Sequence, residues 1–548
     1  MNAMHVLSAA EMQACDRATT ERFGIPSIQL MRAAASAVAA FARQQFPHAR
    51  RVTVLCGKGN NGGDGMMAAR LLADPGLEVT TLLLGSPDQL TGDAAIAFRE
   101  LMSSKGGPIH ATPNAKSLAE HNEALDTDLI IDAVLGTGFK PPLKGLALDA
   151  LEWLRGSRVP VLALDLPSGW PADETGATIA DPVFPADAVI TFTAPKPAHV
   201  FGQLTSRWDQ PVVVAPIGSP DAAIVSALQL EWAGSSLALA QTPRAAEANK
   251  GNFGHVLVVG GTFGSAGGKA GAPAMTALAA MRAGAGLVTA AVPAPALPVI
   301  SSFAPELMTW PLAATRAGQI AAKNLEPGPM AALLAGKTVL AVGPGLGQGA
   351  ETARFVAALL NASKIPAVID ADALNILAER PALLAKLAKG RTLVLTPHPG
   401  EMARLAQTAV AEVQANRLKT ARGFAQRLGV TLVLKGARTL IAHPDGRVTV
   451  NTSGNPGMAK GGSGDLLTGL IAGLLAQYPH DTAHAVEAAV YLHGRAADLA
   501  VYEGDEHTLL ATDSLAQLAR AFQSHAHRFD VGGENGYVWL QGALHPAD

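Results

Sequence analysis

The chain has 548 residues, 49% of them hydrophobic, and a formal net charge of −3. This length exceeds one ordinary hydrophobic core, so we expect at least two domains, and no uninterrupted apolar run or signal-peptide core indicates a membrane partner or secretion. Two cysteines and the lack of a dense basic run exclude a disulfide framework and argue against nucleic-acid binding, so we expect a cytoplasmic protein.

Short apolar strands alternate with helices in the first 220 residues, and polar loops follow the strands. Parallel strands bring such loops to one edge of an open sheet, where ligands bind. This order predicts a Rossmann-like, three-layer α/β/α domain. The predicted helices span residues 8–22, 28–46 and about 66–72, and the predicted strands span 52–56, 128–131, 159–164, 188–192 and 212–214.

A glycine-rich turn, GKGNNGGDG, occupies residues 57–65 between the first strand and the next helix. Glycines let backbone N–H groups approach a ligand, and a helix N-terminus attracts phosphate. The side chains of Asn60, Asn61 and Asp64 add oxygen atoms for a hydroxyl, an amide or a hard cation. An ordinary tight turn rarely needs this composition, so we interpret the segment as a binding loop.

Charged residues follow three strands of this half. Asp132 and Asp165 each end a predicted strand, and Lys196 lies in the loop after the next one. Either aspartate alone could be a helix cap or a turn residue. Their repeated placement between a strand and a glycine-containing loop favours a functional role.

Four motifs of this half, GNNGGDG, IIDAVLGTG, LALDLPSG and TAPKP, together resemble the NAD(P)H-hydrate epimerase domain over nearly all of residues 1–220. The resemblance implies a monovalent cation, usually potassium, bound by Asn61, Asp132 and Ser168. It also implies an acid–base role for Asp165, to which we add Lys196 as a further catalytic candidate. The residues implied in contact with the hydrated dinucleotide are Asn60, Asn61, Gly62, Gly63, Asp64, Gly136, Thr137, Gly138, Phe139, Lys140, Pro141, Pro142 and Asp165.

The second half repeats the alternation of strands and polar loops. Residues 218–248 are weakly patterned, so we place a boundary near residue 225 and predict domains 1–225 and 226–548. The residues after about 525 show no clear pattern. The predicted strands span 256–259, 339–342, 367–369, 393–395 and 431–434, followed by a hairpin of 439–442 and 447–451, and the predicted helices span about 275–283, 485–499 and 514–521.

The segment NTSGNPGMAKGGSGDLLTGLIAGLLA, residues 451–476, places five glycines before an apolar run of helical period that begins at Leu466. Glycine N–H groups and a helix N-terminus together form an anion site, most naturally for nucleotide phosphates. Asp465 lies at the helix start. It could be only an N-terminal cap, although a cap does not need five glycines. We expect the helix dipole to favour its ionised form, which a general base requires.

His398 lies in the turn TPHPGE at the end of a predicted strand. A lone histidine is usually structural, but the flanking prolines and Glu401 hold this one in a rigid turn at the ligand edge, so we interpret it as a substrate contact. No set of histidine, cysteine and carboxylate residues has the spacing of a metal site, and no GxSxG nucleophile elbow occurs.

The glycine loop with its single aspartate resembles the ribokinase-like superfamily, whose aspartate deprotonates the hydroxyl that receives a phosphoryl group. GNPGMAKGGSGD with GPGLG, LTPHPGE and LLATD is more specifically similar to the NAD(P)H-hydrate dehydratase domain, over roughly residues 240–525. Lys460 stands at a position where this family usually has a threonine, and we expect its positive charge to tune nucleotide affinity. The resemblance implies substrate contacts by Ala272, Gly347, His398 and Asp465, and nucleotide contacts by Lys435, Gly436, Ala437, Arg438, Thr439 and Gly464.

Together the two resemblances imply a bifunctional NAD(P)H-hydrate repair enzyme. The first domain would interconvert the R and S epimers of the hydrated cofactors NADHX and NADPHX, with potassium bound. The second, ribokinase-like domain would dehydrate the S epimer with ADP as co-substrate, releasing AMP and phosphate, and Mg²⁺ is a candidate ion there. We expect small-molecule partners and a homo-oligomer.

Two other functions stay open at this level. The second domain could be a kinase for a small vitamin or sugar, with the first domain as a dinucleotide sensor, or the whole chain could bind ligands without catalysis. Net release of a phosphorylated product would favour the kinase. Tight dinucleotide binding without turnover would favour the sensor.

Overall fold

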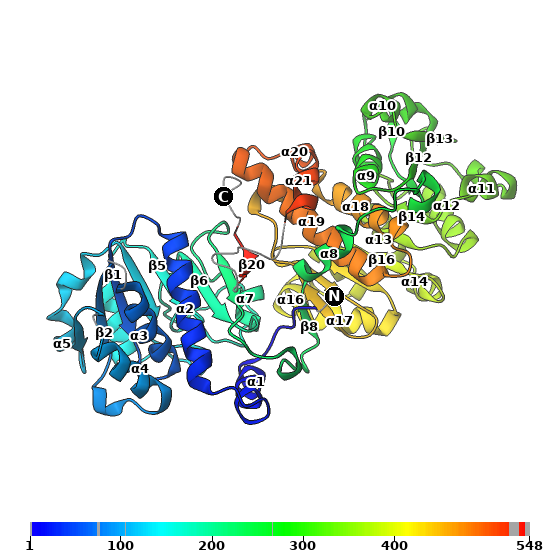
Figure 1. Ribbon diagram of the computed structural model, residues 1–548. Helices are drawn as coiled ribbons and strands as arrows, with labels where there is room; N and C mark the ends of the chain where they lie inside the picture. The colour runs from blue at the N-terminus through cyan, green and yellow to red at the C-terminus, as the bar shows by residue number, and fades with distance from the viewer. Residues whose placement is uncertain (1–2, 74–76, 105, 266, 525–535, 543–548) are drawn as a thin grey trace. The chain divides into compact units, whose positions relative to one another are not determined.

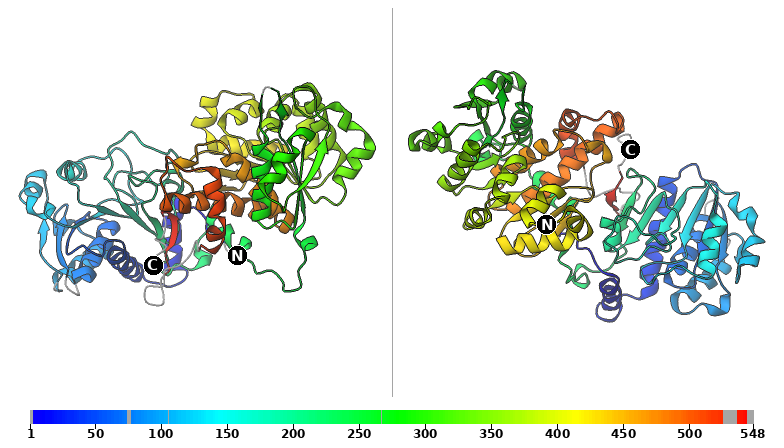
Figure 2. Two further views of the ribbon diagram at one scale, coloured as in Figure 1. Left: turned by 90° about the horizontal axis from the view of Figure 1, so that it is seen from above. Right: turned by 180° about the vertical axis from the view of Figure 1, so that it is seen from behind.

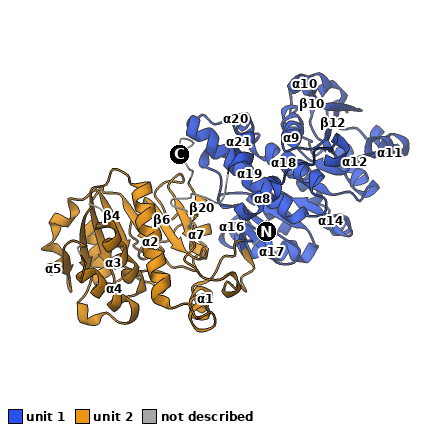
Figure 3. Ribbon diagram, viewed as in Figure 1, with its two compact units in different colours: residues 1–3, 231–524 blue, residues 4–230, 525–548 orange. Residues whose placement is uncertain are grey.

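The computed structural model divides the chain into two compact units (Figures 1 and 3). It describes residues 3–73, 77–104, 106–265, 267–524 and 536–542. The N-terminal unit comprises residues 4–230 with 525–548, and the C-terminal unit comprises residues 1–3 with 231–524. Within the described ranges, no helix is long and apolar enough to cross a membrane.

A mostly parallel sheet forms the centre of the N-terminal unit. In the described part of that unit, every neighbouring pair is parallel except the last strand of the chain, which runs antiparallel to its neighbour. The strands, in their order across the sheet, are β20 (Val538–Gln541), β7 (Val212–Ala215), β6 (Ala188–Phe192), β5 (Val161–Leu164), β4 (Leu129–Ala133), β1 (Arg51–Cys56), β2 (Glu78–Leu83) and β3 (Ile109–Ala111).

Helices cover both faces of this sheet (Figures 1 and 2). Alternate residues of β1 show the two faces, because Val54 packs in the core with α2 and α3 whereas Leu55 packs in the core with α5 and α6. This confirms the predicted three-layer α/β/α arrangement. The helices are α1 (Ala9–Glu21), α2 (Ser27–Gln45), α3 (Asn60–Ala73), α4 (Gly92–Met102), α5 (Ala115–Ala119), α6 (Leu146–Leu154) and α7 (Pro197–Phe201).

The glycine-rich segment differs from its prediction, since α3 begins at Asn60 and not near residue 66. Gly62 and Gly63 are therefore buried helical residues. A Cβ atom at Gly62 would lie 1.9 Å from the carbonyl oxygen of Gly57, and one at Gly63 would lie 2.6 Å from the Met31 side chain. These two glycines are explained by close packing of the helix start.

A second, larger sheet forms the centre of the C-terminal unit. Its neighbouring strands are parallel from β13 to β17, and the predicted hairpin then adds β18 and β19 antiparallel. In order across the sheet, the strands are β13 (Met308–Leu312), β12 (Leu287–Pro293), β9 (His255–Val259), β14 (Val339–Val342), β15 (Ala367–Ile369), β16 (Leu393–Leu395), β17 (Thr431–Leu434), β18 (Leu440–Ala442), β19 (Val448–Val450) and β8 (Leu230–Trp232), and β10 (Phe263–Gly264) and β11 (Gly267–Gly268) form a separate pair.

The predicted apolar helix after the glycine loop is α18 (Ser463–Gln477), which lies against α9 (Gly271–Arg282) and the strands β9, β14 and β15. Small residues permit this approach, because a Cβ atom at Gly469 would lie 2.2 Å from the carbonyl oxygen of Thr276. The helices are α8 (Leu237–Ala240), α9 (Gly271–Arg282), α10 (Leu297–Phe303), α11 (Pro327–Leu334), α12 (Ala350–Ala362), α13 (Ala371–Ala378), α14 (Pro381–Ala388), α15 (Pro399–Ala406), α16 (Val410–Ala415), α17 (Arg417–Leu428), α18 (Ser463–Gln477), α19 (Thr482–Glu503), α20 (Ala511–Ala516) and α21 (Leu518–Gln523).

The end of the chain corrects the predicted domain range 226–548. Residues 538–541 form β20, which pairs with β7 and so belongs to the sheet of the N-terminal unit. Tyr537 and Trp539 are buried there against Phe41 of α2, at ring-centroid distances of 5.5 and 6.1 Å. The N-terminal unit is therefore built from both ends of the sequence.

Candidate active sites

The carboxylate of Asp165 is the centre of the candidate site in the N-terminal unit. Asp165 follows β5, and its φ angle of 62° lies in the left-handed region. Oδ1 accepts hydrogen bonds from the ammonium of Lys196 and the hydroxyl of Thr191, both at 2.9 Å. Oδ2 accepts hydrogen bonds from the backbone N–H of Thr137, at 2.7 Å, and from the Thr137 hydroxyl. Two predicted catalytic candidates, Asp165 and Lys196, thus form a direct ion pair.

Burial and charge act in opposite directions on Asp165. Burial alone would raise its pKa, but the charge of Lys196 and the hydrogen bonds from Thr137 outweigh it and hold the pKa well below its usual range. The Lys196 side chain is itself 2% exposed. The site therefore contains a buried, ionised carboxylate at neutral pH.

Two further carboxylates lie near this pair. Partial burial and the charges of Asp165, Asp16 and Asp93 raise the pKa of Asp64 well above its ordinary value. Asp64 was predicted as a site residue. Asp16, on α1, was not, because an isolated aspartate on a predicted helix carries no motif that could identify it.

The three predicted cation ligands come together around the carbonyl of Leu135. The Ser168 hydroxyl donates to Asp132 at 2.6 Å, and the Asn61 amide lies 3.1 Å from the Leu135 oxygen. Asp132 is fully buried, and burial raises its pKa to about 6 against hydrogen bonds from Ser168 and Val134. These hydrogen-bond donors are uncharged, so a bound monovalent cation would stabilise the buried carboxylate.

The predicted dinucleotide-binding segment 136–142 divides into two parts. A Cβ atom at Gly136 would lie 2.9 Å from Oδ2 of Asp165 and 3.2 Å from the Asn61 side chain, so Gly136 lies between two candidate groups. Phe139 packs against the hydrophobic core instead. The remaining predicted residues, whose contact with substrate stays a prediction, are the exposed Gly138, Lys140, Pro141 and Pro142.

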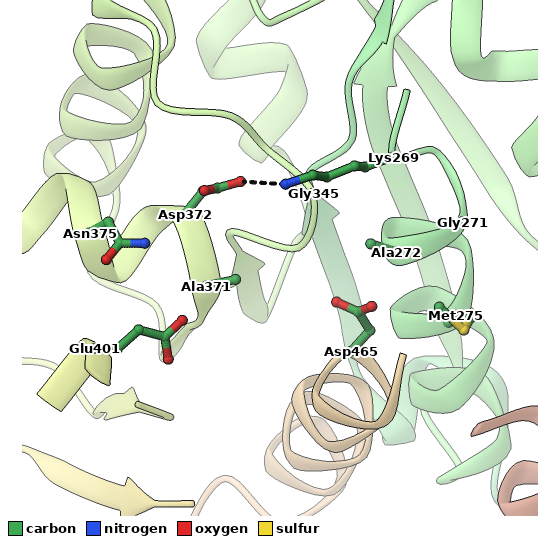
Figure 4. A pocket seen from close by; sticks show the side chains of 10 residues that line it. All are labelled: Lys269, Gly271, Ala272, Met275, Gly345, Ala371, Asp372, Asn375, Glu401 and Asp465. Carbon is green, nitrogen blue, oxygen red and sulfur yellow. Dashed lines mark ion pairs between the residues drawn. The ribbon is translucent and has the colours of Figure 1, made fainter. Parts of the chain in front are cut away.

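Asp465 lies in the first turn of α18, in the candidate site of the C-terminal unit. The N-cap position is occupied by Gly462, at a φ of 96°, so Asp465 is not the capping residue. Its carboxylate lines a pocket of about 430 Å³ (Figure 4). The cap-only interpretation of Asp465 is therefore wrong. The residues lining the pocket are Lys269, Gly271, Ala272, Met275, Gly345, Ala371, Asp372, Asn375, Glu401 and Asp465.

The pKa of Asp465 is shifted in the direction opposite to the predicted effect of the helix N-terminus. Burial and the nearby charge of Asp370 raise its pKa to about 6, whereas Lys435 and Lys269 oppose this shift. The helix N-terminus was expected to favour the ionised form, but burial and a like charge outweigh it. A carboxylate with this pKa is still mostly ionised at pH 7 and is a stronger base than an ordinary aspartate.

Asp370 connects three strand ends to the start of α18. Its carboxylate, 2% exposed, accepts hydrogen bonds from Lys435 at 2.8 Å, Thr396 at 2.8 Å and Thr468 at 2.9 Å. Although burial opposes the charge of Lys435, Asp370 and Glu401 raise its pKa. Asp370 was not among the predicted site residues, although its position at the end of a strand is the same signal that identified Asp132 and Asp165.

The four predicted substrate contacts of this unit lie at or next to the pocket. Ala272 and Asp465 line it directly. The backbone N–H of Gly347 donates to the pocket-lining Asp372 at 2.8 Å. The carboxylate of Asp372 also lies 3.9 Å from the Lys269 ammonium (Figure 4). The backbone N–H of His398 donates to the pocket-lining Glu401 at 2.8 Å.

His398 has a second role that the sequence did not reveal. Its Nδ1 atom accepts hydrogen bonds from the N–H groups of Gly400 and Glu401, which caps α15. Its side chain is 52% exposed. The imidazole is therefore both a structural cap and accessible, and its contact with substrate stays a prediction.

The predicted nucleotide residues follow β17 in a turn next to α18. A Cβ atom at Gly464 would lie 3.5 Å from the Lys435 ammonium, so these two predicted residues are adjacent. The Thr439 hydroxyl donates to the carbonyl of Gly436 at 2.9 Å, and the guanidinium of Arg417 holds the carbonyl of Ala437 at 2.5 Å. These two hydrogen bonds hold the turn in place.

The side chains of two cationic residues of this region, Arg438 and Lys460, donate to backbone carbonyl groups. The Arg438 guanidinium donates to the carbonyl of Thr452 at 3.1 Å, and burial lowers its pKa to about 10. The ammonium of Lys460 donates to the carbonyl of His507 at 2.5 Å. The effect of Lys460 on nucleotide affinity therefore stays a prediction, and it requires that the ammonium leave the carbonyl of His507.

Comparison with known proteins gives the same division of the chain. The family model YjeF-related protein N-terminus matches residues 27–198, and the family model NAD(P)H-hydrate dehydratase matches residues 256–520. The first match includes Asp165 and Lys196, and the second includes Asp465. The protein is thus an α/β enzyme of two fused units, one epimerase-type and one dehydratase-type.

Relatives similar along nearly the whole chain define the family. A bifunctional NAD(P)H-hydrate repair enzyme from Moorella thermoacetica is 40% identical, over 93% of this chain and 95% of the relative, and one from Escherichia coli is 36% identical, over 93% of each. An ADP/ATP-dependent NAD(P)H-hydrate dehydratase from Bacillus subtilis, crystallised with ATP and Mg²⁺, is 34% identical over 52% of this chain and 96% of its own, with a TM-score of 0.45. The chain belongs to the family of bifunctional NAD(P)H-hydrate repair enzymes.

Proposed function

We propose that the N-terminal unit interconverts the R and S epimers of hydrated NADH and NADPH, and that the C-terminal unit dehydrates the S epimer at the expense of ADP. The observation that carries this proposal is the position of Asp465. Its carboxylate lines a pocket, while the neighbouring residue Gly464 lies beside the Lys435 ammonium at the N-terminus of α18. A proton acceptor and an anion site are thus adjacent.

This arrangement supports phosphorylation of the substrate hydroxyl. Hydroxide is a poor leaving group, whereas phosphate is a good one. Asp465 accepts the proton of the C6 hydroxyl, whose oxygen attacks the β-phosphorus of ADP as the bond to AMP breaks. The N–H groups at the start of α18 and the Lys435 ammonium stabilise the developing negative charge. The ring nitrogen then expels phosphate from C6, and loss of a C5 proton restores the nicotinamide double bond.

The epimerisation rests on Asp165 and Lys196. The ionised carboxylate is in the proton-accepting form, and the ammonium 2.9 Å away can donate a proton. Gly136 and Thr137 lie directly against the same carboxylate, which supports their predicted contact with the hydrated ring. The pair would therefore act as the acid and base on the reacting centre.

The ions differ in how well the described residues fit them. Asn61, Asp132 and Ser168 offer oxygen ligands and a buried carboxylate, which suits potassium, whose role would be to neutralise this charge beside the substrate. In the described ranges, no group of three or more histidine, cysteine, aspartate or glutamate side chains is arranged to hold a metal ion. We therefore assign no protein ligands to Mg²⁺. Homo-oligomeric assembly and a cytoplasmic location stay predictions.

One assay tests this function. The purified protein is incubated with mixed hydrate epimers, and the absorbance of the reduced nicotinamide is followed with ADP, with ATP and with neither. We expect full recovery of both epimers with a nucleotide and none without. Recovery without nucleotide would contradict the phosphorylation step, and accumulation of a stable phosphorylated product would indicate a kinase instead.

A further inference from the structure

The imidazole of His199 joins the backbones of the two charged residues of the N-terminal site. His199 lies on the short helix α7 and is fully buried. Its Nδ1 atom lies 3.0 Å from the backbone nitrogen of Lys196, and its Nε2 atom lies 2.6 Å from the backbone carbonyl oxygen of Asp165. One side chain thus spans both members of the Asp165–Lys196 ion pair.

The two contacts require one tautomer of this imidazole. A backbone nitrogen is a donor, so Nδ1 must accept from Lys196, and the proton must lie on Nε2, which donates to the carbonyl of Asp165. Burial and the positive charge of Lys196 lower the pKa of His199 to about 4, which agrees with a neutral ring. The ring is therefore a fixed donor and acceptor at neutral pH.

The residue that receives this hydrogen bond has an unusual backbone conformation. A φ of 62° is uncommon for a residue with a Cβ atom and persists where surrounding contacts stabilise it. The backbone N–H of Asp165 donates to the carbonyl of Ile190 at 2.7 Å. The Nε2–H of His199 holds the carbonyl on the other side of the same residue, so both peptide groups of Asp165 are fixed.

We propose that His199 is a positioning residue for the epimerisation: through these two backbone contacts it sets the separation and direction of the Asp165 carboxylate and the Lys196 ammonium. The proposal rests on the proposed function of this pair. His199 does not touch substrate, because it has no exposed surface. Its effect is expected in kcat, since misplacement of reacting groups lowers the rate of chemistry without a matching loss of binding.

Three substitutions separate this role from packing. His199→Gln keeps a donor near the Nε2 position, His199→Asn keeps an acceptor near the Nδ1 position, and His199→Leu removes both. We expect kcat of epimerisation to fall about 10-fold to 100-fold in the leucine variant with KM within about 2-fold, and to recover to within about 5-fold in the glutamine variant. The asparagine variant should resemble leucine, because it leaves the Asp165 carbonyl without its donor.

The C-terminal unit supplies the internal control, since dehydration of pure S epimer should be unchanged in all three proteins. Leucine-variant kcat within 2-fold of wild type would overturn the proposal, as would equal losses in the glutamine and leucine variants. A crystal structure of each variant gives a second readout that does not depend on activity. An unchanged Asp165 φ and Lys196–Asp165 distance in the leucine variant would also overturn it, whereas absent wild-type epimerase activity would contradict only the proposed function.

Discussion

The ammonium of Lys435 lies 2.8 Å from Oδ1 of Asp370, beside the first turn of the helix that carries Asp465. Asp370 acts on Asp465 in two ways, since it is a like charge that raises the pKa of the base, and it also holds the cation that lowers this pKa. The balance of these effects sets the pH range in which Asp465 can accept a proton.

We expect Asp370→Asn to move the acidic limb of dehydration to lower pH. In the wild type, activity should fall as the pH drops through about 6, because protonated Asp465 cannot act as a base. Removing the Asp370 charge removes a cause of the raised pKa and leaves Lys435 free to approach Asp465. Both changes lower the pKa of Asp465. The measurement is kcat/KM for S-hydrate from pH 5 to 8.

A matched control keeps the charge and removes one hydrogen bond. Thr468→Val deletes the donor that lies 2.9 Å from Oδ2 of Asp370. Its acidic limb should stay close to that of the wild type, and its free energy of unfolding should fall by about 1 kcal/mol. An unshifted limb in Asp370→Asn would contradict the electrostatic role of Asp370.

Asp465→Asn should lose dehydration and keep the fold. The amide has nearly the same size but cannot accept the proton, and loss of a general base costs about 10²–10⁴ in rate. Epimerisation, ADP affinity and melting temperature should stay near wild type, because Gly462 and not Asp465 occupies the N-cap of α18. Turnover of S-hydrate within a few-fold of wild type would remove Asp465 from the mechanism.

Asp165→Ala should slow conversion of the R epimer and leave repair of pure S-hydrate intact. The substitution leaves the buried Lys196 ammonium without its partner carboxylate, which can cost about 3–5 kcal/mol of stability. Asp165→Asn is therefore the milder companion variant, because its amide oxygen can still accept from Lys196. Loss of S-hydrate dehydration in either variant, with the C-terminal unit folded, would contradict the division of labour.

Epimerase activity should depend on potassium and not on zinc. Asp132 is fully buried among neutral hydrogen-bond donors, so a monovalent cation beside it would stabilise its ionised form. We expect activity to rise with K⁺ at constant ionic strength and to be unaffected by a zinc chelator. Asp132→Asn should remove the K⁺ response. Inhibition by the chelator that added zinc reverses would contradict the assignment.

Strand ends and glycine loops could be predicted from the sequence because they are local patterns. The residues 188–192, 339–342 and 431–434 were predicted as strands with the bounds that the structure shows. The strands β2 and β12, each second from one end of its sheet, were not predicted, and neither was the early start of α3. The local sequence patterns of β2, β12 and the start of α3 are weak. Pairing within the sheet determines the two strands, and the packing of Gly62 against Gly57 determines the helix start.

Contacts between distant segments explain the remaining site residues. Asp370 and His199 show their roles only when strand ends or backbone groups far apart in sequence come together. The pKa of Asp465 also depends on a neighbour 95 positions away in the chain, which a helix-dipole argument does not include. Local sequence therefore identified the reacting groups better than the groups that position and tune them.

The last prediction concerns the segment that returns to the N-terminal unit. Deleting residues 525–548 removes β20 and exposes the edge of β7, together with the core positions that Tyr537 and Trp539 fill. The Tyr537 hydroxyl also donates to the carbonyl of Ala37 at 2.8 Å. Burying two large side chains contributes about 3–6 kcal/mol. At about 2–4 °C per kcal/mol, the melting temperature of the N-terminal unit should fall by at least about 6 °C.

The C-terminal unit provides the control for this deletion, because β20, the described strand that the deletion removes, belongs to the sheet of the N-terminal unit. Dehydration of pure S-hydrate and the thermal transition of that unit should be unchanged, whereas epimerase activity should be lost at a lower temperature. Tyr537→Phe removes only the hydroxyl contact and should cost about 1 kcal/mol. Calorimetry with both activities measured after heating separates the two units. Equal melting of the N-terminal unit with and without residues 525–548 would show that β20 does not stabilise its sheet.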